Sequence, residues 1–293
     1  MGICLSCCYE EIKNFNNNEL CIKLPHGLNY IKYCNNTNIF IKYSDINIWL
    51  KSLYNNKNWL NWIVYNDQIN KIGHTHTKKG HCKGILTWNN NKIGWLCHST
   101  PNFPKYFDGN DISDIEKSEL IFGQCFQYVE INYNENTLDD ILLQIDIMQA
   151  NIYIEKYNNK NRINANNIKL KKINLSNTIT HIAKSPHYEI DIYSNYLVNE
   201  NNDPWYIETW MRGHKIDDDY EIIAHHKIKD ISELKFEDIN YNEKQDHSKW
   251  ATTQNMYWVG DLNRMKSQYK RGGGGFIIKD VNISNSLYKL IIK

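Results

Sequence analysis

Two short blocks of this 293-residue chain combine the residue types needed to break a phosphodiester bond. The block G-H-C-K-G contains His81 and Lys83, and the block D-H-S-K-W contains His247 and Lys249. In such a pair of His-x-Lys units, one imidazole can attack phosphorus while the other protonates the leaving oxygen. The two ammonium groups can hold the charged phosphoryl oxygens, as a divalent ion does in other enzymes. The pattern therefore predicts phosphodiester chemistry without a metal or other cofactor.

A His-x-Lys tripeptide on its own is weak evidence, because this chain contains four of them. The other two begin at His76 and His225. In a chain with eleven histidines and many lysines, one or two such tripeptides are expected by chance. The residues that flank each tripeptide must therefore show which of the four belong to a catalytic site and which occur by chance.

Several longer blocks resemble, in order and nearly in spacing, those of the deoxyribonuclease II family, part of the phospholipase D superfamily. The resemblance runs from about Cys8 to Gly275 and is weak only in the middle of the chain. The blocks that carry it are K-L-P at 23–25, Y-N-D-Q at 65–68, G-H-C-K-G-I-L at 80–86, H-S-T-P-N-F-P at 98–104, F-G-Q at 122–124, D-H-S-K-W at 246–250, G-D-L-N-R at 260–264 and K-R-G-G-G at 270–274. The chain departs from the family at Ala251, where the family has a cysteine, and at Asn89, where it has an acidic residue.

The resemblance implies an endonuclease that hydrolyses double-stranded DNA to 3′-phosphate ends. One histidine would form a phosphohistidine and the other would act as acid and then as base; the sequence leaves open which is which. The catalytic positions so implied are His81, Lys83, His98, His247, Lys249 and Asn263. The positions implied for substrate binding are Lys270, Arg271, Gly272 and Gly273, in a glycine-rich loop whose backbone can approach a phosphate.

The resemblance also implies an acid enzyme, and histidine chemistry agrees with it. One imidazole must start neutral and the other protonated, and an unperturbed imidazole titrates near ~6.5. Nearby lysines lower the pKa of an imidazole. We therefore expect activity below neutral pH.

Hydrophobic patterning predicts an α/β protein. Alternating residues predict strands at 20–24, 28–33, 39–43, 59–65, 84–88, 93–98, 205–211 and 256–262. Helical spacing predicts a helix from Leu138 to Met148, with Thr137 and Asp140 forming a capping box. A second helix is predicted at 188–198, and the four glycines at 272–275 are predicted to form a loop.

The family resemblance implies two phospholipase D-like α/β/α halves that form a pseudo-dimer with one active site between them. Residues 8–156 are predicted to form the first half and residues 169–293 the second, each with one His-x-Lys unit. The polar residues 157–168 are the predicted linker. Because one chain supplies both units, the sequence leaves monomer and homodimer open.

The first seven residues predict attachment to a membrane. Met-Gly-x-x-x-Ser is the pattern for N-myristoylation of Gly2, and Cys4 or Cys7 can carry a palmitoyl group as the second anchor. A cytoplasmic location at a membrane face is therefore expected, with the family's lysosomal or secreted location as the alternative. All eight cysteines lie in the first 125 residues, and pairing of Cys8 with Cys125 stays open.

Three other interpretations compete with a nuclease. A phospholipase D-type phosphodiesterase would suit a lipid anchor. A catalytically inactive protein could bind DNA or a partner at a membrane, and the net charge of +1 requires any DNA-binding charge to be local. A metal cluster is disfavoured because its candidate ligands lack the spacing of known zinc sites. Those candidates are His74, His76, His81, Cys82, Cys97 and His98.

Overall fold

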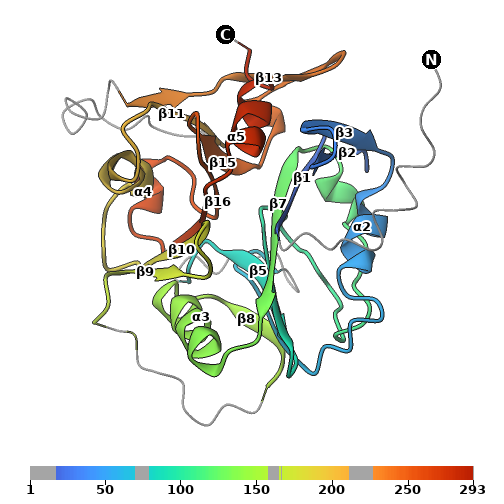
Figure 1. Cartoon of the computed structure of the whole chain (residues 1–293), viewed down its shortest axis with the longest axis vertical. Helices are drawn as coiled ribbons and strands as arrows, with labels where there is room; N and C mark the ends of the chain where they lie inside the picture. Colours follow the sequence, from blue (N-terminus) through green and yellow to red (C-terminus); the bar gives the residue numbers. More distant parts are fainter. Residues whose placement is uncertain (1–17, 70–78, 158–164, 166, 211–226, 293) are drawn as a thin grey trace.

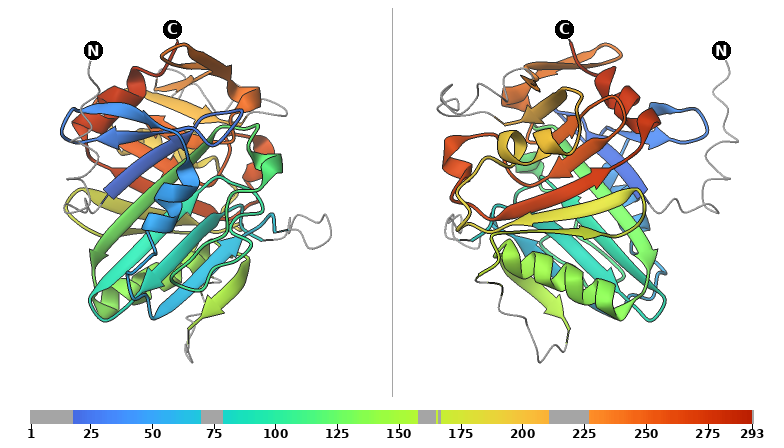
Figure 2. Two further views of the ribbon diagram at one scale, coloured as in Figure 1. Left: turned by 90° about the vertical axis from the view of Figure 1, so that its right-hand side faces the viewer. Right: turned by 60° about the vertical axis from the view of Figure 1, so that its left-hand side comes forward.

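The computed structural model describes residues 18–69, 79–157, 165, 167–210 and 227–292 and shows a mixed α/β protein built on two large sheets (Figure 1 and Figure 2). The predicted α/β class is confirmed. Outside the described residues lie Gly2, Cys4, Cys7, Cys8, His74, His76 and His225. Acylation of the N-terminus therefore stays a prediction. Within the described residues, no helix has the length and apolar character needed to span a bilayer.

The first sheet has eight strands in the order β3-β2-β1-β7-β6-β5-β4-β8, all with antiparallel neighbours. Its strands are β1 (Asn18–Lys23), β2 (Tyr30–Cys34), β3 (Ile39–Tyr43), β4 (Asn61–Asn66), β5 (Lys83–Trp88), β6 (Lys92–His98), β7 (Gln124–Asn132) and β8 (Ile152–Lys156). The six strands predicted in this half are present within two residues of their predicted bounds. Strand β7 was not predicted, because its polar residues Gln124, Gln127 and Glu130 recur at every third position rather than at every second.

The second sheet has seven strands in the order β12-β11-β15-β16-β17-β10-β9. Its strands are β9 (Leu170–Asn174), β10 (Ile179–Lys184), β11 (Trp205–Thr209), β12 (Ile228–Asp230), β15 (Lys249–Thr252), β16 (Tyr257–Gly260) and β17 (Gly273–Ile278). A separate hairpin pairs β13 (Glu233–Phe236) with β14 (Ile239–Asn242). Strands β11 and β16 correspond to the two strands predicted in this half.

Five strands follow the same order in both sheets: β1-β7-β6-β5-β4 in the first and β10-β17-β16-β15-β11 in the second. In the first sheet the chain passes from β1 to β4 and then returns through β5 and β6 to β7, which pairs with β1. In the second it passes from β10 to β11 and then returns through β15 and β16 to β17, which pairs with β10. All of these neighbouring pairs are antiparallel. The flanking strands differ, because β8 pairs antiparallel to β4 whereas β12 pairs parallel to β11. The predicted bounds of the two halves stay a prediction.

The two sheets pack face to face through a shared apolar core. Trp95 of β6 meets Phe276 of β17 edge to face, with ring centroids 5.0 Å apart. His181 of β10 lies 4.2 Å from the same Trp95 ring. Two further apolar clusters lie one within the first sheet's half and one within the second's. Figure 2 shows the strands of the second sheet, yellow to red, layered against those of the first, blue to green.

The described helices are few and short: α2 (Ile46–Ser52), α3 (Glu135–Ile147), α4 (Ile192–Asn195) and α5 (Val281–Tyr288). The helix predicted from Leu138 is α3, but the predicted capping box is wrong. Asn134 is the N-cap, and its side chain accepts the backbone N–H of Thr137. The helix predicted at 188–198 is reduced to α4 and a 3₁₀ turn, because the Asp191 side chain caps the chain at that point.

The predicted glycine loop at 272–275 is wrong from Gly273 onward, since these residues begin strand β17. The glycines permit close packing of strands. A Cβ on Gly274 would lie 2.4 Å from the Ile182 carbonyl oxygen, and one on Gly275 would lie 2.4 Å from the Val259 carbonyl oxygen. Glycine is therefore needed here for space within the sheet.

Gly274→Ala is expected to destabilise the protein by about 1–3 kcal/mol, the usual cost of overpacking a tight core. The atom that the new methyl group would meet, the Ile182 carbonyl oxygen, belongs to the backbone and cannot rotate away. Urea unfolding monitored by circular dichroism measures the change. Thr180→Ala, at a partly exposed position of the adjacent strand β10, is the control and is expected to change stability by less than about 0.5 kcal/mol. Equal stability of Gly274→Ala and the natural protein would contradict the packing argument.

Candidate active site

Both His-x-Lys units lie at the entry of a central strand. Lys83 is the first residue of β5 and Lys249 is the first residue of β15, and these strands hold matching places in their sheets. His81 and His247 precede the strands by two residues. The lysine side chains are only 2% and 4% exposed, so water screens their charges weakly.

His81 is held by the second half of the chain. Its Nδ1 lies 2.8 Å from the carbonyl oxygen of Asp261, and its backbone N–H donates to the carbonyl of Gly272 at 2.7 Å. Burial lowers the pKa of His81 to about 3, and the positive charges of Lys83 and Lys249 contribute to the same shift. The ring is therefore neutral at mildly acidic pH.

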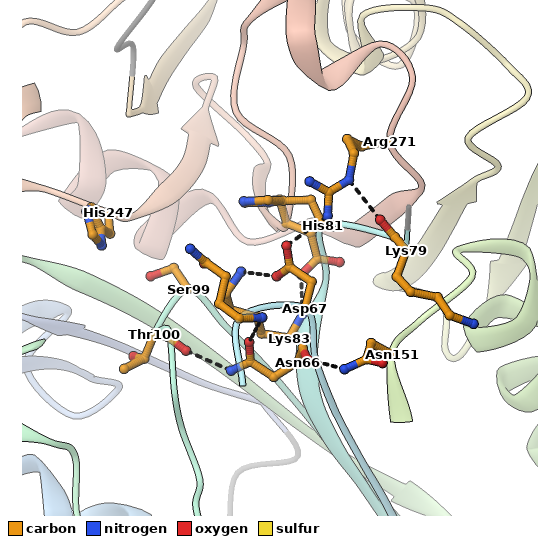
Figure 3. Close-up of polar contacts among 12 residues, drawn as sticks. Asn66, Asp67, Lys79, His81, Lys83, Ser99, Thr100, Asn151, His247 and Arg271 are labelled. Atoms are coloured by element: carbon orange, nitrogen blue, oxygen red, sulfur yellow. Dashed lines mark hydrogen bonds and ion pairs between the residues drawn. The ribbon is translucent and has the colours of Figure 1, made fainter. Parts of the chain in front are cut away.

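A buried carboxylate links Lys83 to Arg271 (Figure 3). Asp67, 1% exposed, accepts from Lys83 Nζ at 2.6 Å and from Arg271 Nη2 at 2.8 Å. Burial would raise the pKa of Asp67, but the Lys83 ammonium and the other neighbouring positive groups hold it below its ordinary value. Arg271 also donates from Nε to the Lys79 carbonyl at 2.8 Å. Arg271 thus fixes the loop before His81.

His247 is held by stacking. Its ring stacks on those of Phe122 and Trp210, with centroids 4.0 Å and 3.4 Å away, and these two rings also contact each other at 5.2 Å. Its backbone N–H donates to the carbonyl of Gly123 at 2.9 Å, so the first half of the chain supports it. The residue is 8% exposed. Aromatic faces therefore help to set the orientation of this imidazole.

Lys249 has its ammonium next to the histidine of its own unit. Its Nζ donates to the His247 carbonyl at 2.6 Å, and its backbone N–H donates to Cys125 Sγ at 3.2 Å. Burial lowers the pKa of Lys249 to about 8, and the Lys83 charge contributes to the shift. Cys125 is a buried free thiol, whereas its candidate partner Cys8 lies outside the described residues.

The two units share one electrostatic environment. The Lys249 charge lowers the pKa of His81, and the Lys83 charge lowers the pKa of Lys249. The backbone of each histidine is bonded to the opposite half. In Figure 3 the His247 imidazole lies to one side of the group around His81 and Lys83. The charges of Lys83 and Lys249 thus act across the two units.

His98 lies at the end of β6, next to the start of β5. Its Nδ1 accepts the backbone N–H of Thr100 at 3.2 Å, and its ring packs on Phe103 and Phe126. Burial, with the Lys83 charge, lowers its pKa to about 3. Among the described residues no hydrogen-bond partner meets its buried Nε2. His98 is thus a neutral ring beside the first unit.

The remaining predicted positions differ in their surroundings. The Oδ1 atom of Asn263 is buried and has no hydrogen-bond partner among the described residues. Lys270 is exposed and lies 3.7 Å from Glu189. Gly272 contacts His81 through its backbone, and Gly273 begins β17.

Sequence reasoning assigned no role to Asp67 or Asp261, although both lie in the blocks that carry the family resemblance. Asp261 accepts from the backbone N–H groups of Lys83 and Gly274 at 3.3 Å and 3.1 Å. Burial raises the pKa of its carboxyl to about 7. Both acids tie the first His-x-Lys unit to the second half, and their position inside motif blocks was the available signal.

In the described parts of the chain, no cluster of three or more His, Cys, Asp or Glu side chains is arranged to hold a metal ion. Of the candidate ligands, Cys97 instead donates to the Asp261 carboxylate at 3.5 Å and Cys82 is a buried free thiol.

Comparison with known proteins gives a consistent family. A sequence model described as Deoxyribonuclease II matches residues 23–293. The chain is 26% identical to Cell-death-related nuclease 7 of Caenorhabditis elegans over 79% of this chain and 68% of that protein. It is 26% identical to Deoxyribonuclease-2-beta of Mus musculus (83% and 74% covered) and 28% identical to Deoxyribonuclease-2-alpha of Sus scrofa (77% and 67%). The resemblance drawn from the motifs is confirmed, and the chain belongs to the deoxyribonuclease II family of hydrolases.

Proposed function

We propose that this protein is an endonuclease that hydrolyses double-stranded DNA with its two His-x-Lys units and without a metal ion. The observation that supports this most is the crossed support of the units: the backbone N–H of His81 donates to Gly272 at 2.7 Å, and that of His247 donates to Gly123 at 2.9 Å. The Lys249 charge also acts on His81. The names of the relatives support DNA as the substrate. The shared strand order supports two phospholipase D-like halves arranged as a pseudo-dimer around one site.

His81 is the nucleophile in this proposal. A carbonyl oxygen can only accept, so the contact with the Asp261 carbonyl places the ring proton on Nδ1 and the lone pair on Nε2. The low pKa keeps that lone pair available in acid. Nε2 attacks phosphorus and forms a P–N bond, the P–O5′ bond breaks, and the departing oxygen takes a proton from His247.

Water completes the reaction. Neutral His247 accepts a proton from a water molecule, whose oxygen attacks the phosphohistidine. The P–N bond breaks, and the 3′-phosphate leaves with His81 restored. Lys83 and Lys249 supply fixed positive charge as negative charge develops on the phosphoryl oxygens. The aromatic rings stacked on His247 hold it in place through both steps.

Cleavage is expected to be fastest in mild acid, between about pH 4 and 6, and to need no added metal. As pH rises, the acid is lost because imidazoles ordinarily titrate near ~6.5, and above pH 8 Lys249 also loses its charge. As pH falls toward 3, His81 becomes protonated and its lone pair is lost. Plasmid nicking in EDTA, measured from acid to alkaline buffers, gives the profile.

The same assay distinguishes the alternatives. Strict dependence on Mg²⁺, or fastest cleavage above pH 8, contradicts the proposed mechanism. Choline release from phosphatidylcholine vesicles without DNA cleavage would favour a phospholipase. Tight DNA binding with no turnover at any pH would favour a non-enzymatic protein.

A further inference from the structure

Two buried lysines outside the His-x-Lys units occupy matching places in the two sheets. Lys23 is the last residue of β1 and Lys184 is the last residue of β10, the strands that begin the shared strand order. Both side chains are fully buried. The sequence repeats around them, as K-L-P-H at 23–26 and K-S-P-H at 184–187. The match in both position and sequence indicates a common role.

Each ammonium group binds three backbone carbonyls. Lys23 Nζ donates to Leu24 and Gly27 at 3.1 Å and to Leu120 at 3.2 Å. An ammonium has three N–H donors and no acceptor, so three carbonyls use all of its hydrogen bonds.

The second lysine repeats this arrangement. Lys184 Nζ donates to the carbonyls of Ser185, Tyr188 and Tyr269 at 3.5, 3.0 and 2.8 Å. With their donors used, neither lysine is arranged to hold a substrate phosphate. Their hydrogen bonds instead fix the backbone.

In each set, the carbonyl that is farthest from the lysine in the sequence belongs to a segment that supports a histidine of the opposite half. Leu120 stands three residues before Gly123, whose carbonyl accepts the backbone N–H of His247 at 2.9 Å. A 3₁₀ turn precedes this segment at Lys117–Glu119. The Asp246 charge next to His247 also acts on Lys23.

The same spacing recurs around the other lysine. Tyr269 stands three residues before Gly272, whose carbonyl accepts the backbone N–H of His81 at 2.7 Å. A 3₁₀ turn again precedes the segment, at Lys266–Gln268.

We propose that Lys23 and Lys184 are positioning residues that act crosswise: Lys23, in the first half, fixes the backbone that supports His247, and Lys184, in the second half, fixes the backbone that supports His81. This inference rests on the proposed function for the catalytic roles of the two histidines. The placement of the rings can nevertheless be measured without DNA.

The test replaces each lysine with methionine, which keeps an unbranched chain and removes the ammonium group. Histidine ring resonances are recorded by NMR on ¹⁵N-histidine-labelled protein and assigned with His81→Gln and His247→Gln. Lys23→Met is expected to shift the ring resonances of His247 and leave those of His81 in place. Lys184→Met is expected to do the reverse. For each variant kcat is expected to fall by about 10- to 100-fold with little change in KM, because the reacting group is misplaced.

Tyr257→Phe is the matched control. It removes a buried hydrogen bond between the halves, from Tyr257 Oη to Gln127 Oε1 at 3.2 Å, but touches neither supporting segment. It is expected to lower stability and leave both histidine resonances unchanged.

Three results would overturn the crosswise roles. In the first, each lysine variant shifts the ring resonances of both His81 and His247. In the second, one of the lysine variants shifts the resonances of neither histidine. In the third, Tyr257→Phe produces the same shifts as the lysine variants. If a methionine variant does not fold, Lys23→Gln or Lys184→Gln, which retains N–H donors, is measured in the same way. Absence of cleavage by the natural protein would refute the proposed function and leave the resonance pattern to decide the positioning roles.

Discussion

His81→Ala is expected to reduce DNA cleavage by about 10⁴-fold or more, because His81 forms the covalent intermediate in the proposed mechanism. The ring is neutral, its Nδ1 proton is directed to the Asp261 carbonyl, and its Nε2 lone pair is available. Initial rates of plasmid nicking, with folding checked by circular dichroism, measure the loss. Comparable activity in His81→Ala and the natural protein would contradict the nucleophile assignment.

A substrate with a good leaving group separates the roles of the two histidines. Nitrophenolate leaves without protonation, so His247→Ala is expected to release about one equivalent per enzyme in a fast burst from thymidine 3′-(4-nitrophenyl phosphate). Later turnover is expected to stay slow, because hydrolysis of the phosphohistidine needs His247 as base. His81→Ala is expected to stay inactive on the same compound. A burst from His81→Ala instead of His247→Ala would exchange the two roles.

Lys249→Met is expected to lower kcat by about 10²–10³-fold, the usual effect of losing one preorganised group that stabilises transition-state charge. The ammonium is buried and close enough to act on both His81 and Lys83, so its charge is poorly screened. Lys172→Met, which removes an exposed ammonium paired with Glu200, is the control and is expected to retain activity.

Lys249→Met is also expected to have an effect on His81 that can be measured without substrate. Removing the positive charge of Lys249 makes the imidazolium form of His81 less unfavourable, so the pKa of His81 is expected to rise. An NMR titration of the His81 ring measures this pKa in Lys249→Met and in the natural protein. An unchanged pKa would show that the two His-x-Lys units are electrostatically independent.

The strands of the first half could be predicted because short runs rich in aromatic and β-branched residues form them. Turn residues such as Asn89 also mark their ends, and the strand predicted at 39–43 matches β3. Strand β7 was missed because its polar residues recur at every third position and break the period of two. Strand β17 was hidden by its glycines, whose loop preference is outweighed by the need for space beside Ile182 and Val259.

The site could be predicted only as a set of motif positions. The two His-x-Lys units and His98 could be singled out as candidates, since each lies in a block of several matching residues. The contact of His81 with the Asp261 carbonyl joins residues 180 positions apart, and no local pattern records such a distance. The repeat around Lys23 and Lys184 is also hard to recognise in the sequence, because the two copies share only the lysine and the Pro-His pair that follows it.

A crystal structure with bound orthovanadate, which adopts the geometry of the phosphoryl transition state, tests most directly whether both units act on one phosphate. We expect vanadium bonded to His81 Nε2, with the Lys83 and Lys249 ammonium groups on its equatorial oxygens and His247 at the opposite apical oxygen. Vanadate held by the residues of only one unit, with the other histidine out of reach, would contradict a shared active site.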